Sequence, residues 1–295
     1  MSENIRIASS RLSAEISPFG AELRALRDGQ GRDLLWDGDP AWWTGRAPIL
    51  FPVIGVLNGG VYRIDGVAHP MPKHGFARHS DFAVAALAAD MVALRLTDSE
   101  ATRAVWPFAF TLDLIYTIAA ATLTMEAVVT NADARPMPAS FGYHPALRWP
   151  LPYDGSRAAH RIRFAEAEPD PVRRIDGEGL LRPDRLPTPI VGDTLALDDS
   201  LFVDDALILD SVRSRRLHFG APGVEGLDVT FDDLPTLALW TKPGAPYLCI
   251  EPWQGIADPQ AYAGDIVDKP GIVTIAPGES RRFTMTIALS APEPA

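Results

Sequence analysis

Three short segments of this 295-residue chain concentrate side chains that can move protons or hold a polar ligand. The segments are 72–78 (PKHGFAR), 140–145 (SFGYHP) and 249–255 (CIEPWQG). The first two each carry a histidine near a glycine and an aromatic residue, and histidine exchanges a proton near neutral pH. The third carries a carboxylate close to an indole. These groups predict one pocket for acid–base chemistry, assembled from segments far apart in the chain.

Glu251 is the acidic member of this group. It follows the apolar run 247–250, so we expect it at the end of a buried strand, where an unpartnered carboxylate is costly. Trp253 beside it favours a sugar site, because an indole stacks on C–H faces while the acid accepts hydroxyl hydrogens. A glutamate that simply reaches solvent remains the alternative. Cys249 shares a face with Glu251 in a strand and is expected to be a small buried filler.

His74 and His144 are the two histidines with glycine and aromatic neighbours. Taken singly, each could instead be a core histidine with satisfied nitrogens. Of the other four, only His79 is close enough in sequence to reach the same pocket. Two histidines and Glu251 could also form a facial metal triad. Because no closely spaced histidine pair supports a metal, we predict neither a metal nor another cofactor.

Composition and missing motifs exclude other classes of function. The chain has no Gly-x-Ser-x-Gly elbow, P-loop or dinucleotide fingerprint. The formal net charge of −11 argues against nucleic acid and anionic membranes as partners. One cysteine excludes an internal disulfide framework, and no run approaches the ~20 apolar residues of a membrane span. We expect a cytoplasmic monomer or homodimer that binds a small neutral molecule.

Strand patterns predict the scaffold. Apolar and polar residues alternate with period two in the segments 110–116, 123–129, 227–231 and 283–289. Glycine- and proline-rich turns separate them, and helical pattern is limited to short stretches at 39–43 and 98–104. The proline-rich segment 169–193 is too short to divide the chain. We predict one all-β domain over residues 1–295, a large antiparallel β-sandwich with few short helices and a concave face lined from strand ends and corners.

The same segments, together with several others, occur in an order typical of a known family. The chain resembles the aldose 1-epimerase (galactose mutarotase-like) family, and within it the LacX-like branch. The matching segments are 45–55 (GRAPILFPVIG), 71–78, 141–145, 205–208, 249–255, 268–272 and 277–279. The resemblance runs from about the first predicted strand to the last. It implies the galactose mutarotase-like supersandwich with an open groove for a pyranose.

The resemblance also implies roles for individual residues. It assigns Glu251 as general base and His144 as general acid, and it places His74 near the ring oxygen of the sugar. Sugar-binding roles fall to an arginine, Arg46, and to an aspartate that is either Asp205 or its neighbour Asp204. The full substrate-binding set that we expect is Arg46, Arg78, Asp205 and Trp253.

The predicted function is that of an isomerase, an aldose 1-epimerase that interconverts the α and β anomers of an aldohexose. A carboxylate and an imidazole on opposite sides of the sugar suffice for ring opening and closure. One alternative is a carbohydrate-binding or sensing protein without turnover. Another is a hexose-phosphate mutarotase, because Lys73, Arg78 and His79 lie near the pocket motif. We nevertheless expect Arg78 to pair with a neighbouring carboxylate and Lys73 to be solvated.

Overall fold

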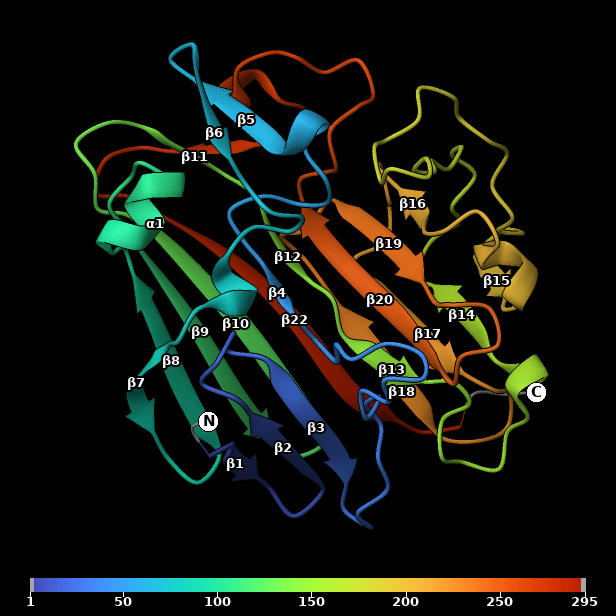
Figure 1. The fold of residues 1–295 in the computed structure, drawn as a ribbon. Helices are drawn as coiled ribbons and strands as arrows, with labels where there is room; N and C mark the ends of the chain where they lie inside the picture. The colour runs from blue at the N-terminus through green and yellow to red at the C-terminus, as the bar shows by residue number, and fades with distance from the viewer. Residues whose placement is uncertain (1–2, 293–295) are drawn as a thin grey trace.

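The computed structural model describes residues 3–292, and its regular structure is almost entirely β (Figure 1). The larger sheet has nine antiparallel strands, in the order β15 (Thr194–Ala196), β14 (Arg161–Phe164), β17 (Arg216–Gly220), β18 (Gly226–Thr230), β22 (Ser280–Ser290), β10 (Thr122–Asn131), β9 (Phe110–Ala119), β8 (Met91–Thr97) and β7 (Ala83–Leu87). All four strands predicted from period-two alternation are confirmed, as β9, β10, β18 and β22. In β9 and β10 buried and half-exposed residues alternate, as expected for strands that cover a core on one face.

A second sheet of six strands carries the segments that the sequence singled out. Its order is β16 (Leu207–Leu209), β19 (Thr236–Trp240), β20 (Tyr247–Gln254), β12 (Phe141–Tyr143) and β4 (Ile49–Leu50), with β13 (Ala146–Arg148) also paired to β20. Three smaller sheets join β1 (Ile5–Ala8), β2 (Leu12–Ile16) and β3 (Leu23–Asp28); β5 (Val61–Ile64) and β6 (Val67–Pro70); and β11 (Met137–Ala139) and β21 (Val273–Ile275).

The two large sheets pack face to face across one apolar core. The Phe141 ring on β12 stacks on the Phe283 ring of β22, with centroids 5.2 Å apart. The Tyr143 hydroxyl reaches across the same interface and contacts the carbonyl oxygens of Met125 and Phe283 at 3.0 and 3.1 Å. Each such fully buried side chain contributes ~1.5–3 kcal/mol of hydrophobic stabilisation. The predicted all-β sandwich is confirmed; its extent as one domain over residues 1–295 stays a prediction.

Short helices occupy corners of the sandwich. Within residues 3–292 they are α1 (Glu100–Val105) and the 3₁₀ turns η1 (Asn58–Gly60), η2 (Ala77–His79), η3 (Arg157–Ala159), η4 (Asp199–Phe202) and η5 (Ile266–Asp268). The helix expected at 98–104 is α1. Residues 39–43 form a hydrogen-bonded turn and not a longer helix, because the Arg46 and Ala47 amides that a further turn would need donate to the Glu22 carboxylate at 2.8 and 3.0 Å. None of the described helices has the length and apolar character needed to cross a membrane.

Strand β20 separates the core from the candidate site. Leu248 and Ile250 point into the core, whereas Cys249 and Glu251 alternate onto the outer face of the second sheet. The sequence suggested that Glu251 ends a strand, but it lies inside β20. The strand continues to Gln254 because its last residues pair with β12. The outer face therefore has a buried carboxyl in the middle of a strand.

Candidate active site

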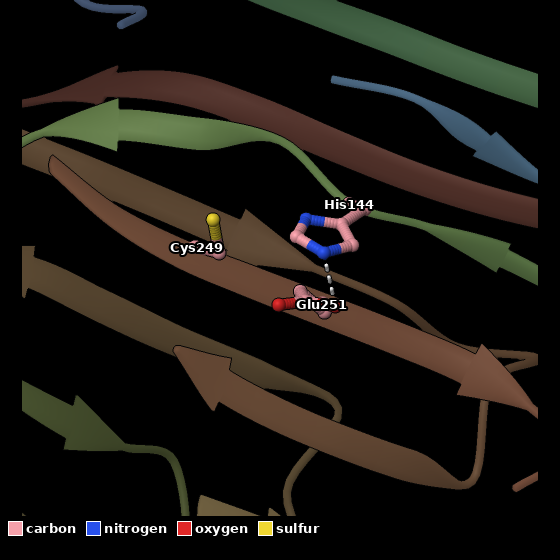
Figure 2. A group of neighbouring side chains, drawn as sticks. All are labelled: His144, Cys249 and Glu251. Carbon is pink, nitrogen blue, oxygen red and sulfur yellow. Dashed lines mark ion pairs between the residues drawn. The ribbon is translucent and has the colours of Figure 1, made fainter. Parts of the chain in front are cut away.

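The pairing of β20 with the segment 141–148 positions His144. Strand β12 pairs with Trp253 and Gln254, and β13 pairs with the start of β20, in one unchanged register on both sides of His144 and Pro145. The Ile250 amide donates to the Pro145 carbonyl at 3.2 Å, so the two segments stay together between the short strands. His144 therefore lies directly opposite Glu251, and its Nε2 is 3.2 Å from the Glu251 carboxyl oxygen Oε2 (Figure 2). The acid and base candidates therefore lie in contact, and not on opposite sides of a sugar-sized space as we expected.

Burial controls the protonation of this pair. His144 is 8% exposed and Glu251 is 2% exposed. Burial, followed by the charge of Arg78, lowers the pKa of His144 to about 3. Burial likewise raises the pKa of Glu251 well above its ordinary value, against the opposing charge of Lys73. The pair therefore rests as a neutral imidazole beside a protonated carboxyl, with one proton available to share.

His74 reaches the same place from an unusual backbone conformation. It and Gly75 both adopt left-handed dihedrals, with φ of 66° and 74°. The glycine approaches the Phe51 carbonyl oxygen so closely that a Cβ would lie 2.1 Å from it, which explains the glycine better than approach to a ligand does. The Gly55 amide donates to His74 Nδ1 at 3.1 Å, so Nε2 carries the proton. Burial lowers the His74 pKa, and the nearby charges of Lys73 and Arg78 add to the effect, so the ring stays neutral.

These groups face one cleft of about 450 Å³ on the outer face of the second sheet. The predicted residues on its lining are His74, Arg78, His144, Asp205, Glu251 and Trp253. His79 also lines it, as the sequence suggested. Of the two candidate aspartates, Asp205 faces this cleft and Asp204 faces only an adjoining groove. Segments that are about 180 residues apart thus meet at one surface.

Arg46 is the predicted site residue that the cleft does not include. Its guanidinium donates to the Arg24 carbonyl at 2.6 Å, and its backbone amide donates to Glu22 at 2.8 Å. Burial, followed by the charge of Arg24, lowers its pKa. These contacts hold Arg46 against the β3 region in this structure. A sugar-binding role for Arg46 stays a prediction.

Two tryptophans on the lining were missed by the sequence reasoning. The Trp43 ring lies 5.0 Å from the His144 ring, and Trp240 approaches His144 edge-on at 5.9 Å. Trp240 ends β19 beside Cys249, in a register that places Ala238 opposite Glu251. The available signal was the tandem tryptophan that follows Asp39, which we took only as a helix start. Together they make the cleft wall aromatic, as suits the C–H faces of a sugar.

Cys249 completes a buried trio with His144 and Glu251, whose ligand atoms all lie within 4.8 Å of one another (Figure 2). The trio could hold a metal only after the thiol and the carboxyl had lost their protons. Burial raises the pKa of Cys249 well above its ordinary value, so the thiol keeps its proton. The expected role as a buried filler agrees with its packing beside Trp36 and Tyr247. The absence of a metal stays a prediction.

Known proteins resemble the chain over its whole length. The sequence model described as aldose 1-epimerase matches residues 3–288. The chromosomal protein LacX of Lactococcus lactis subsp. lactis is 30% identical, over 97% of this chain and 99% of that protein. A galactose mutarotase-like protein from Lactobacillus casei ATCC 334 has 29% identity and a TM-score of 0.90, covering 97% and 100% of the two chains. A galactose mutarotase related enzyme from Lactobacillus acidophilus has 27% identity and a TM-score of 0.88, covering 98% of each.

Proposed function

The chain belongs to the aldose 1-epimerase family, and we propose that it is a mutarotase that interconverts the α and β anomers of an aldohexose. One observation carries the proposal: a buried imidazole and a buried carboxyl touch at 3.2 Å on the wall of a cleft lined with tryptophan. Each can accept or donate a proton, and neither is engaged elsewhere by a salt bridge in the described chain.

The side-by-side arrangement suits anomer exchange. The reaction takes a proton from the hydroxyl on C1 and delivers one to the ring oxygen, and both oxygens are bonded to C1. The acid and the base must therefore reach two neighbouring atoms. Glu251 and His144 do so when the sugar lies across the pair, with Trp253 under its C–H face. General acids and bases positioned in this way typically contribute ~10²–10⁴-fold in rate.

Ring opening uses the pair as carboxylate and imidazolium, which it reaches by moving its shared proton from Oε2 to Nε2. The Glu251 carboxylate accepts the C1 hydroxyl proton while His144 Nε2 donates to the ring oxygen. The O–H electron pair forms the C1 carbonyl, and the electrons of the broken C1–O bond go to the ring oxygen. Rotation about C1–C2 and reversal of both transfers closes the other anomer. His74 Nε2–H donates a hydrogen bond near the ring oxygen, and Asp205 accepts from hydroxyls.

The test is anomer exchange followed by NMR on glucose and galactose, with and without the protein. We expect enzyme-dependent exchange between the anomeric proton signals, in excess of the buffer rate, for at least one of them. A protein that leaves exchange unchanged for these and other common aldoses contradicts the proposal. Polarimetry on freshly dissolved α-anomers gives an independent measure.

A sugar-binding protein without turnover is the second candidate. The resting pair is a neutral imidazole and a protonated carboxyl, so neither group is in the form that starts ring opening. Binding alone would need no change in that state. Calorimetric sugar binding combined with buffer-level anomer exchange would favour this candidate over the mutarotase.

A further inference from the structure

Two positive charges line the cleft without a protein partner. Within residues 3–292, neither the Lys73 ammonium nor the Arg78 guanidinium forms an ion pair or a hydrogen bond. Glu22 is the carboxylate whose charge raises the pKa of Arg78. Both of its oxygens are already bound, one by the Arg24 guanidinium at 2.6 Å and one by the Arg46 amide at 2.8 Å. The ion pair that we expected for Arg78 is therefore not formed.

Arg78 is fixed by its backbone and is half-buried. It belongs to η2, where Gly20 packs on its carbonyl so tightly that a Cβ there would lie 2.8 Å from the oxygen. An arginine in such a place usually has an acidic neighbour. Arg182 shows the usual arrangement in the larger groove that adjoins the cleft, because Asp184 accepts from two of its nitrogens at 2.7 and 3.0 Å. Unlike Arg182, Arg78 therefore has N–H donors without an acceptor in the described part of the chain.

The two cations surround the histidine side of the site. The charges of both Lys73 and Arg78 lower the pKa of His74 and of His144, so both lie close to these rings. In the proposed reaction His144 serves the ring oxygen of the sugar. The ring carbon C5 is bonded to that oxygen and carries C6. A substituent on C6 would therefore lie beside the histidines, within reach of the two cations.

Building on the proposed function, we propose that the substrate is an aldose with an anionic group on C6, a hexose 6-phosphate or a hexuronate, bound by Arg78 and Lys73. The planar guanidinium offers paired donors to two oxygens of a phosphate or a carboxylate. Lys73 adds a second positive charge at the cleft edge. The acidic total of −11 makes this local excess of positive charge a specific feature of the cleft.

The test compares anomer exchange of a neutral sugar, its 6-phosphate and its uronate, in the glucose and galactose series, by NMR with enzyme-free rates subtracted. We expect the anionic sugars to have a kcat/KM at least about tenfold higher. Arg78→Met should lower the ratio of anionic to neutral kcat/KM by ~10–100-fold, as expected for losing hydrogen bonds to a charged group. Arg78→Lys should lower it less. Lys73→Met, at an exposed position, should lower it by a few-fold.

Arg182→Met is the matched control, because it removes the same charge from the adjoining groove and should leave the ratio within about twofold. Preference for the phosphate or for the uronate identifies the anion, and either supports the proposal. Equal exchange of neutral and anionic sugars, with a ratio that Arg78→Met and Lys73→Met leave unchanged, overturns it while the mutarotase function stands. If the unaltered protein accelerates anomer exchange of none of these sugars, the proposed function itself is overturned.

Discussion

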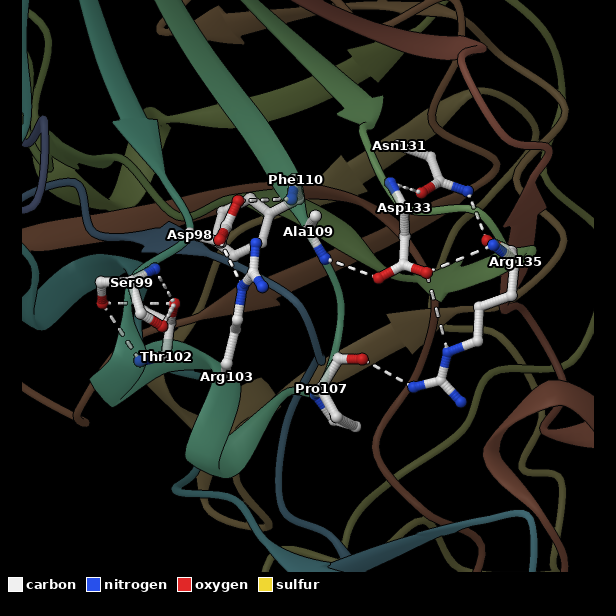
Figure 3. Close-up of polar contacts among 10 residues, drawn as sticks. All are labelled: Asp98, Ser99, Thr102, Arg103, Pro107, Ala109, Phe110, Asn131, Asp133 and Arg135. Atoms are coloured by element: carbon white, nitrogen blue, oxygen red, sulfur yellow. Dashed lines mark hydrogen bonds and ion pairs between the residues drawn. The ribbon is translucent and has the colours of Figure 1, made fainter.

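The cleft differs from the corner where α1 meets β9 and β10 in whether its polar side chains have hydrogen-bond partners within the protein. In the corner the buried Asn131 side chain accepts from the Asp133 amide at 2.9 Å and donates to the Arg135 carbonyl at 2.9 Å (Figure 3). It also donates to the Ile275 carbonyl at 2.8 Å. Asp133 in turn accepts the Ala109 amide, which lowers its pKa. These groups use their hydrogen-bonding capacity within the protein.

In the cleft, buried polar atoms have no partner. His144 Nδ1 and the Trp253 indole N–H are both buried, and neither forms a hydrogen bond within residues 3–292. Such atoms cost stability in the free protein. The polar side chains around Asn131 therefore stabilise the fold, whereas we expect the unpartnered polar groups of the cleft to serve a ligand. Substitutions in the two regions should therefore separate activity from stability.

The largest expected effect is the loss of anomer exchange in Glu251→Gln. Glutamine keeps the size of the side chain but cannot accept the C1 hydroxyl proton, so the rate should fall by ~10²–10⁴-fold while sugar still binds. His144→Asn should cost a comparable factor. The double variant should lose less than the product of the two, because either missing proton transfer leaves the ring closed. NMR exchange measures the rate and calorimetry measures binding.

The same variant tests the comparison from the side of stability. Because the resting pair is neutral and glutamine keeps a hydrogen-bond donor beside His144, the free energy of unfolding should change by less than ~1 kcal/mol. Urea unfolding of Glu251→Gln against the unaltered protein measures this. A variant that is folded and exchanges anomers at near-normal speed would show that Glu251 is not the base. A variant that unfolds much more easily would show that the pair is structural.

The next largest effect is expected from pH. Outside the active range, kcat/KM for anomer exchange should fall about tenfold per pH unit on the acid and on the alkaline side. Ordinary pKa values of 4.5 and 6.5 would confine activity to the range between them. Here the active pair holds one shared proton. It loses that proton only as pH rises through the raised pKa of Glu251, and it gains a second only as pH falls towards about 3, the pKa of His144. We expect kcat/KM to stay level through weakly acidic pH and fall on the alkaline side.

Measurement from about pH 4 to about pH 10 at constant ionic strength checks the profile. The two limbs belong to the pair and not to either residue alone. An acid limb at the ordinary pKa of glutamate would show that the buried contact does not govern catalysis. Wild-type protein kept folded at each pH, as judged by fluorescence, is the control.

Sequence pattern predicted the sandwich because period-two alternation reports directly on a sheet with one buried face. The strands β9, β10 and β22 carry that signal over ten or more residues. Short strands did not, since β12, β13 and β4 have two or three residues each. The order of the sheets and the placement of His144 opposite Glu251 depend on pairings far apart in the chain, which local pattern does not encode.

For the site, sequence identified the groups but not their relative positions. His144 and Glu251 were named, yet their direct contact follows from the register in which the segment 141–148 pairs with β20. The unpaired charge of Arg78 was not foreseen, because the amides of Arg46 and Ala47 that engage Glu22 reach it only through tertiary contacts. Trp43 was overlooked because the sequence of residues 39–43 is typical of the start of a helix. The motifs therefore predict which residues form the site, whereas the pairing of strands far apart in the chain determines where those residues lie.

Asn131→Ala probes the corner. It removes three hydrogen bonds and leaves the Ile275 carbonyl and the Asp133 amide without their partner, so the free energy of unfolding should fall by ~1–3 kcal/mol. Urea unfolding measures the loss. Anomer exchange per folded molecule should stay within about twofold, since no cleft residue contacts this side chain. A tenfold loss of exchange at unchanged stability would remove the distinction between the regions.

The smallest effect is expected for Ser99→Ala at the start of α1. The Ser99 hydroxyl accepts the Thr102 amide at 3.2 Å while the Thr102 hydroxyl accepts the Ser99 amide at 2.8 Å, a reciprocal capping box (Figure 3). Losing one half should lower the free energy of unfolding by ~1 kcal/mol, with anomer exchange unchanged. Ser99→Asp keeps an acceptor and places a negative charge at a helix N-terminus, so it should restore the stability. If Ser99→Asp is as unstable as Ser99→Ala, the serine acts through packing and not as a cap.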